Sequence, residues 1–170
     1  MKNFLLFAII LVSLLSCTKQ DRENNIADQE KRIDSYIEGL NPVRIQKNAG
    51  VSRLVFKEGI GTDSLSVGDS VKLYYSGHIF SRGKGKLFVT NVDSVARANG
   101  FECMMAPLGL KLEKGSMIDG LYYGLQGAKV GEKCELVFSS KYGYGNTVVY
   151  NIPKLTPLIF EIEIVEITKN

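Results

Sequence analysis

Few residues in this sequence are suited to covalent or metal-assisted chemistry. His78 is the single histidine among 170 residues, so a His-rich metal site cannot be built, and a serine or cysteine nucleophile would need His78 as its base. No phosphate-binding glycine loop of either common type occurs. The net charge is only +3, and the basic group at Arg82, Lys84 and Lys86 is typical of a solvated hairpin tip. We therefore expect no metal, no cofactor and no nucleic acid.

Aromatic side chains are the better candidates for a functional site. They fall in different predicted strands and turns, at Tyr75, Phe88, Tyr142, Tyr144 and Phe160. Gathered by a fold, they would form a concave apolar pocket with tyrosine hydroxyls as fixed donors, which suits an apolar, ring-shaped group. The alternative is that they fill a small core. Spacing alone leaves both interpretations open.

Strands joined by glycine turns must position these aromatic residues. Apolar and polar residues alternate in residues 71–76 and 133–139, the pattern of strands with one buried face. We also expect strands at residues 51–56 and 158–164, and a change of phase at Val165 indicates a bulge or a frayed end.

One helix interrupts the strands. Apolar residues at helical spacing occupy 118–125, Ser116 can cap the helix with Asp119 three residues later, and Gly127 lies just past its end. Strands around one short helix predict an α+β domain with a mostly antiparallel sheet.

Several short segments together resemble the FKBP-type peptidyl-prolyl cis-trans isomerases. Residues 71–77 are similar to that family's V-x-V-x-Y-x-G strand, and residues 142–145 to its Y-x-Y-G element. The other matching segments are residues 85–88, 107–112, 117–121, 130–133, 152–153 and 158–163. Their order and most of their spacings agree from about residue 51 to 168, which is far more specific than any single segment.

This resemblance implies a curled antiparallel sheet wrapped around one short helix, with a proline-binding pocket between them. It implies catalytic positions at Tyr75, Phe88, Ile118, Tyr144 and Phe160. It implies substrate-binding positions at Leu108, Met117, Leu121 and Ile152. The expected ligand is a proline in an extended peptide segment, and a monomer is expected.

Isomerisation of an Xaa-Pro bond needs no nucleophile, metal or proton shuttle. The barrier of about 18–20 kcal/mol arises from amide resonance, and a dry pocket disfavours the charge-separated resonance form. By resemblance, the Tyr144 hydroxyl and the Ile118 backbone N–H would donate hydrogen bonds to neighbouring carbonyls. Phe88, Phe160 and Tyr75 would hold the proline ring.

The sequence departs from the family pattern at four places. Val89 replaces an Asp beside the pocket, Leu121 replaces the Trp of the pocket floor, and Leu108 replaces a wall Phe. The segment from Asn91 to Ala106 is longer than the family's usual flap, so it could cover the pocket, add a partner surface or be mobile. The main hypothesis is an isomerase that helps exported proteins to fold. The alternative, favoured by Val89, is a catalytically weak or inactive FKBP-like lipoprotein that binds peptide or a protein partner.

The N-terminus has the features of a bacterial lipoprotein leader. Lys2 precedes an almost uninterrupted apolar run over residues 4–15, which is too short for a hydrocarbon core of ~30 Å at ~1.5 Å per residue. The run ends in Leu-Leu-Ser before Cys17, which resembles a lipobox. We expect lipid on Cys17 to anchor the protein in the cell envelope of a Gram-negative bacterium, on a periplasmic or outer-membrane face. The alternative is ordinary cleavage with an unmodified Cys17.

Three segments follow from these patterns: a signal peptide at 1–16, a lipidated and charged tether at 17–45, and an FKBP-like domain at 46–170. Within the tether, Ile33 and Ile37 recur at helical spacing, which predicts a short helix docked on its own domain. Cys134 alternates with core residues of a strand, as a buried thiol would. A disulfide between Cys103 and Cys134 is the less favoured alternative.

Overall fold

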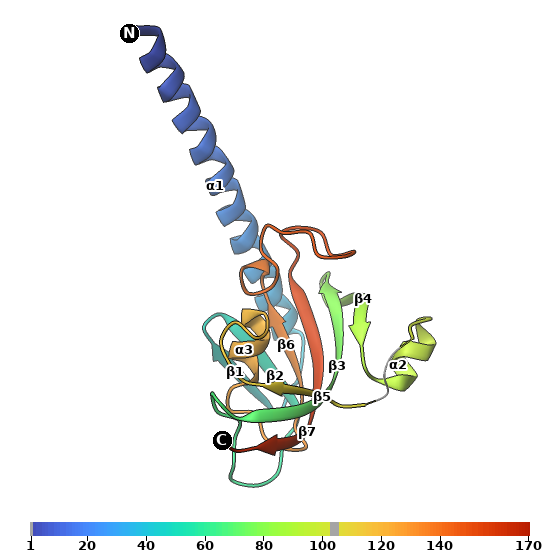
Figure 1. The fold of residues 1–170 in the computed structure, drawn as a ribbon. Helices are drawn as coiled ribbons and strands as arrows, with labels where there is room; N and C mark the ends of the chain where they lie inside the picture. The colour runs from blue at the N-terminus through green and yellow to red at the C-terminus, as the bar shows by residue number, and fades with distance from the viewer. Residues whose placement is uncertain (1, 103–105) are drawn as a thin grey trace.

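The computed structural model describes the backbone of residues 2–102 and 106–170, and the side chains of residues 19–102 and 106–170. Within these residues seven strands form one antiparallel sheet in the order β1-β2-β6-β7-β3-β4, and β5 pairs with the first part of β3 (Figure 1). The strands are β1 Arg44–Asn48, β2 Val51–Lys57, β3 Ser70–Phe80, β4 Lys84–Thr90, β5 Leu108–Lys111, β6 Lys133–Phe138 and β7 Leu158–Thr168.

Helices flank this sheet on different sides. They are α1 Lys2–Glu38, α2 Asp93–Ala98, α3 Asp119–Leu125 and the 3-10 turn η1 Ser140–Tyr142. The sheet curls around α3, so the predicted α+β architecture is confirmed (Figure 1). In the part of the chain that the structure describes, no helix combines the length and the apolar character needed to cross a membrane.

Helix α3 lies against the inner face of the sheet. Leu125 is fully buried there in one cluster with Leu136, Phe138 and Phe160. The helix backbone approaches the sheet's side chains closely at Gly124, where a Cβ would lie 2.8 Å from the side chain of Leu136. This contact fixes the helix whose N-terminal end, at Ile118, faces the cavity described below.

The second half of α1 covers the opposite face of the sheet. Ile33 and Ile37 are buried against Leu54, Val137 and Ile159, which form a second apolar cluster. The predicted docking of this helix on its own domain is therefore confirmed. Helix α1 begins before the segment that we expected to be a tether and continues through most of it to Glu38, and β1 begins at Arg44 inside the same segment.

The docked helix explains a difference from the sequence pattern in β6. We expected one buried face, yet every residue from Cys134 to Phe138 is buried. Cys134, Leu136 and Phe138 face α3, whereas Val137 lies under α1. A sheet covered on both faces no longer requires alternating polar residues.

The phase change at the end of β7 is a β-bulge. Lys72 pairs with Glu166 and Leu73 pairs with Ile164, so Val165 is the extra residue of the ladder. The bulge turns Val165 outward, where it is partly exposed. The predicted irregularity is confirmed.

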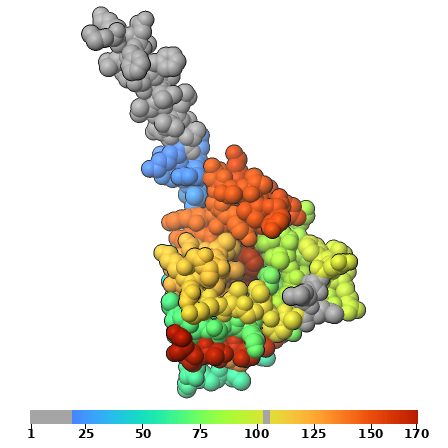
Figure 2. Space-filling model, in the orientation of Figure 1, coloured from blue at the N-terminus to red at the C-terminus, as the bar shows by residue number. Residues whose placement is uncertain are grey.

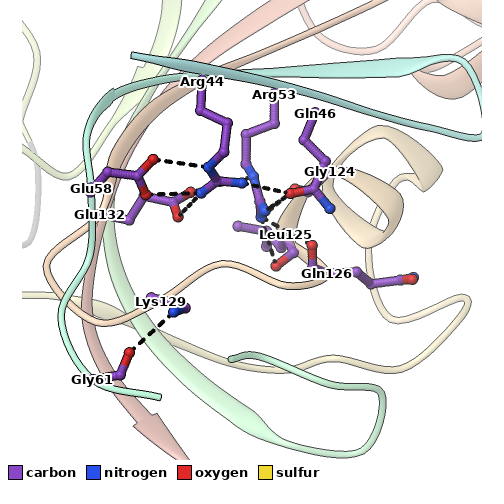
Figure 3. A network of polar contacts seen from close by, with 10 residues as sticks. All are labelled: Arg44, Gln46, Arg53, Glu58, Gly61, Gly124, Leu125, Gln126, Lys129 and Glu132. Atoms are coloured by element: carbon purple, nitrogen blue, oxygen red, sulfur yellow. Dashed lines mark hydrogen bonds and ion pairs between the residues drawn. The ribbon is translucent and has the colours of Figure 1, made fainter. Parts of the chain in front are cut away.

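A buried ion network fastens the C-terminal end of α3 to β1 and β2 (Figure 3). Arg53 is 1% exposed, and its Nη1 donates to the carbonyls of Gly124, at 3.1 Å, and Gln126, at 3.0 Å. Its Nε lies 3.3 Å from the carboxylate of Glu132, which is fully buried. Arg44 reaches the same carboxylate at 3.2 Å from the outside. A cation at the last carbonyls of a helix also complements the helix dipole.

The predicted cap of α3 is wrong. Helix α3 begins at Asp119 with Ile118 as its N-cap residue, and no side chain caps it. The Ser116 hydroxyl instead donates to the carbonyls of Lys111 and Glu113 in the preceding turn. Ser116 lies two residues before the N-cap position, so it belongs to the preceding turn rather than to the helix.

Candidate functional site

A cavity of about 590 Å³ lies between α3 and the inner face of the sheet. In Figure 2 the red of β7 shows at the bottom of a hollow between the yellow segment around α3 and the green strands. The cavity brings together all the residues that the family resemblance implied. The expected catalytic positions on its wall are Tyr75, Phe88, Ile118, Tyr144 and Phe160, and the expected substrate-binding positions are Leu108, Met117, Leu121 and Ile152. Their individual roles stay predictions.

Stacked aromatic rings form the floor of the cavity. Phe160 from β7 is buried, with Phe88 from β4 at a centroid distance of 5.7 Å and an interplanar angle of 87°. Phe138 lies parallel to Phe160 on the other side, 6.0 Å away. Gly77 is needed beneath them, because a Cβ there would lie 2.8 Å from both Phe88 and Phe160. The floor therefore offers a rigid aromatic surface of the size of a proline ring.

Two tyrosine hydroxyls and one backbone amide are free to donate in this apolar space. Among the described residues, no hydrogen-bond partner is present for the hydroxyls of Tyr75 and Tyr144 or for the N–H of Ile118. Burial, and then the neighbouring Tyr144, raises the pKa of Tyr75. Burial, and then Tyr150, raises the pKa of Tyr144. Both hydroxyls thus keep their protons well above neutral pH.

Val89 lines the cavity where the resemblance places an Asp. None of the lining residues that the structure describes carries a carboxylate, an amine or an imidazole. The replacement therefore leaves Tyr75 without an acidic acceptor and the cavity without charge. Any selectivity inside it must come from shape and from neutral donors.

Residues 143–155 form the rim next to Tyr144. Ile152 is buried and makes an isolated bridge to Val149. Tyr150 also lines the cavity but is 99% exposed, with a positive φ of 49°. Tyr150 and Asn151 both line the cavity but were not among the predicted site residues, although an aromatic residue in a loop just before the Ile-Pro element was an available signal.

The long segment after β4 is fixed at its start and turns away from the cavity. Asn91 accepts a hydrogen bond from the Tyr75 N–H at 2.7 Å and donates to the carbonyls of Leu73 and Ala106. No described residue of the segment 91–102 lines the cavity, and α2 lies beyond β4 at the edge of the sheet (Figure 1). Its described part does not cover the pocket.

His78 and the cysteines lie outside this site. The side chain of His78 is 13% exposed, and its Nε2 lies 3.3 Å from the Glu161 carboxylate and its Nδ1 3.2 Å from the Gly85 carbonyl. Cys134 carries a free, buried thiol, and burial raises its pKa. The side chains of Cys17 and Cys103 lie outside the described residues.

Comparison with known proteins defines the class to which this fold and this cavity belong. A family model described as FKBP-type peptidyl-prolyl cis-trans isomerase matches residues 61–165. FK506-binding protein 1 of Aspergillus oryzae is 33% identical over 119 residues, which cover 69% of this chain and 98% of the relative. FK506-binding protein 1A of Neurospora crassa is 35% identical over 119 residues, covering 69% and 88%.

Solved structures agree on the fold. FkpA from Escherichia coli superposes with a TM-score of 0.61 at 23% identity, covering 95% of this chain and 70% of that one. A peptidyl-prolyl cis-trans isomerase from Pseudomonas syringae gives a TM-score of 0.64 at 23% identity, covering 86% and 96%. The chain belongs to the FKBP-type peptidyl-prolyl cis-trans isomerase family. It is a peptidyl-prolyl cis-trans isomerase and acts on proline-containing peptides.

Proposed function

We propose that this isomerase acts on Xaa-Pro bonds of exported proteins, as a folding helper anchored in the cell envelope through lipid on Cys17. A monomer suffices for this role, because residues of one chain line the cavity. The observation that carries the catalytic part is an uncharged cavity with an aromatic floor, whose neutral donors have no hydrogen-bond partner among the residues that the structure describes. The sequence around Cys17 carries the anchoring part.

The cavity suits the requirements of this reaction. The proline ring would pack on Phe160 between Phe88 and Tyr75, with Leu121 and Met117 closing the wall. Removing water disfavours the charge-separated form of the amide, so the C–N bond loses double-bond character and rotates more easily.

Neutral donors would stabilise the twisted amide. The Ile118 N–H and the Tyr144 hydroxyl lie on the cavity wall without described partners, so hydrogen bonds to the substrate carbonyls cost them no existing contact. Donors whose partners form best in the twisted geometry lower the barrier, whereas equal binding of all geometries would not.

Refolding of an exported protein limited by an Xaa-Pro bond tests the substrate class. We expect the chain, with Cys17→Ser for solubility, to accelerate the slow phase at substoichiometric concentration, and Tyr144→Phe to weaken that effect. Short Xaa-Pro peptides followed by NMR exchange provide the reference activity. Acceleration of the peptides without acceleration of refolding would overturn the role as a folding helper.

Metabolic labelling with a radioactive fatty acid tests the anchor. We expect label on the parent chain, none on Cys17→Ser, and recovery of the parent chain with membranes. A matched Cys134→Ser variant should keep its label, because that thiol is buried in the domain. Equal labelling of the parent and Cys17→Ser chains would overturn lipidation at this residue.

A further inference from the structure

Helix α1 reaches the loop that carries Tyr144 through one buried polar side chain. Gln29 is 1% exposed, and it is the one buried polar residue among the described side chains of this helix. The residues that it contacts are more than a hundred positions away in the sequence. A buried side-chain amide is retained only where its hydrogen bonds are met.

The amide of Gln29 is fully engaged. Its Oε1 accepts from the Ser140 N–H at 2.7 Å, and its Nε2 donates to the Leu155 carbonyl at 2.8 Å. With its second Nε2 proton, Gln29 donates a hydrogen bond to the side-chain oxygen of Asn25 in the same helix. Both contacts with the domain are to main-chain atoms, so they fix the path of the backbone.

These contacts complete a closed ring of hydrogen bonds at the base of the loop. The Gly145 N–H donates to the Ser140 carbonyl at 2.9 Å, and the Leu155 N–H donates to the Gly145 carbonyl at 2.7 Å. Gln29 joins the two open ends of this chain, at Ser140 and Leu155. Gly145 directly follows Tyr144, so the ring holds the backbone on which the Tyr144 hydroxyl depends.

The loop has little regular secondary structure of its own, although Ile152 is buried in the core. Between η1 and β7 its regular pairing within the described residues is the single bridge from Val149 to Ile152. Leu155 and Tyr150 adopt positive φ values of 54° and 49°, a conformation that side-chain-bearing residues keep only when their surroundings impose it. Gln29 provides such a constraint at Leu155.

We propose that Gln29 is a positioning residue for the isomerase reaction, which holds the Tyr144 loop in its substrate-binding conformation and so couples helix α1 to the active site. The amide suits this task because it accepts and donates at once, whereas an ionised carboxylate can only accept. This proposal rests on the substrate-binding role proposed for Tyr144.

The test compares Gln29→Ala and Gln29→Glu with the parent full-length chain. For Gln29→Ala we expect KM for an Xaa-Pro peptide to rise about threefold to tenfold, the equivalent of a lost buried hydrogen bond, with a smaller change in kcat. The amide NMR signals of Ser140 and Gly145 should shift. Gln29→Glu keeps only the acceptor at neutral pH, so its KM should approach that of the parent at acidic pH, where a protonated carboxyl can also donate.

Ile37→Ala is the matched control on the same helix. Ile37 is buried against the sheet in the second apolar cluster, away from the Tyr144 loop. Its truncation should lower stability without changing KM or the Ser140 signal at temperatures where the chain is folded. Parent-like KM values and loop signals in both Gln29 variants would overturn the proposal. If the loop signals shift in the Gln29 variants but KM is unchanged in Tyr144→Phe, the result would instead contradict the role proposed for Tyr144.

Discussion

At the scale of single residues, the chemistry of this pocket is defined by Val89, which stands where the family pattern has a carboxylate. The change leaves Tyr75 and Tyr144 as neutral donors whose pKa values are raised. A hydroxyl of raised pKa stays protonated further into the alkaline range, so it continues to donate. Binding in this pocket therefore depends on hydrogen bonds and shape rather than on charge.

Tyr144→Phe measures the worth of one of these donors. We expect the affinity for a proline peptide to fall by about 0.5–1.5 kcal/mol, the usual net value of one hydrogen bond. Isothermal titration calorimetry with a short Xaa-Pro peptide measures this difference in binding free energy. Tyr142→Phe is the control, because Tyr142 lies two residues away and does not line the cavity. A similar loss in both variants would contradict a specific role for the Tyr144 hydroxyl.

Val89→Asp restores the missing carboxylate. We expect kcat/KM to rise several-fold, because a charged acceptor orders the Tyr75 hydroxyl, while the free energy of unfolding falls by about 1–3 kcal/mol through burial of a polar group. NMR exchange and urea denaturation measure the two effects. Val89→Asn, which has a similar shape without the charge, is the control. An unchanged rate for Val89→Asp would mean that the carboxylate does not limit catalysis.

At the scale of elements, helix α3 is held along one face and at its C-terminal end. Packing on Phe138 and Leu136 fixes its face, and Arg53 fixes its C-terminal carbonyls. The Arg53–Glu132 pair is costly to bury unless both partners remain. Its value lies in where it holds the helix rather than in net stability.

Arg53→Met separates these contributions. We expect a loss of about 3–5 kcal/mol, because Glu132 then stays buried with only the partly exposed Arg44 near it, and the double variant Arg53→Met/Glu132→Leu should recover much of that loss. Urea denaturation of the parent chain and these variants gives the free energies of unfolding, from which the coupling between Arg53 and Glu132 follows. Arg44→Met provides a milder control, since Arg44 contacts the same carboxylate from a partly exposed position. A double variant no more stable than Arg53→Met alone would argue against an ion-pair origin.

The docking of α1 on the sheet should weaken at alkaline pH. Burial, then Glu135, which accepts a hydrogen bond from the Tyr36 hydroxyl at 2.9 Å, raises the pKa of Tyr36 to about 12. An unfolded tyrosine titrates near pH 10. The stabilisation from this group is therefore complete below about pH 10 and is lost as the pH rises toward 12.

Denaturation curves between pH 8 and pH 12 check this expectation. Tyr36→Phe removes the titrating group and should flatten the decline, while leaving the contact with Phe80. A decline of equal slope in both chains would assign the effect to other groups.

At the scale of the whole molecule, the sheet is a middle layer with a helix on each face. The outer cluster of Leu54, Phe80, Val137 and Ile159 is covered by the docked half of α1. Without that helix the sheet would expose a continuous apolar patch.

A chain that begins at residue 42 tests this view. We expect it to unfold at a lower urea concentration and to self-associate, because the apolar patch is then free. Sedimentation velocity and urea denaturation measure both effects. Substituting Leu54 and Val137 by Thr in the shortened chain should reduce the association. A shortened chain that stays monomeric and equally stable would contradict a structural role for α1.

Sequence patterns predicted the residues of the cavity better than the contacts that hold the surrounding helices and loops in place. Tyr75, Phe88 and Tyr144 each belong to a short ordered motif, and the fold brings all three to one cavity. The bulge at Val165 could also be predicted, because it changes the alternation of apolar and polar residues within one strand. No such pattern marks Gln29, whose bond to Leu155 spans 126 positions. The cap predicted at Ser116 failed because a hydroxyl can serve several local carbonyls equally well.

The projecting half of α1 has a geometric consequence. Its residues from Lys19 to Asp28 form a helical stretch with mostly exposed side chains that leads away from the end of the domain (Figures 1 and 2), and this stretch is ~15 Å long at the rise of an α-helix. The Tyr144 loop lies beside this half, at the end of the domain from which the helix projects. With lipid on Cys17, as proposed, this helix would set the distance between the bilayer and the mouth of the cavity. The cavity would then lie within reach of unfolded chains that emerge at the membrane.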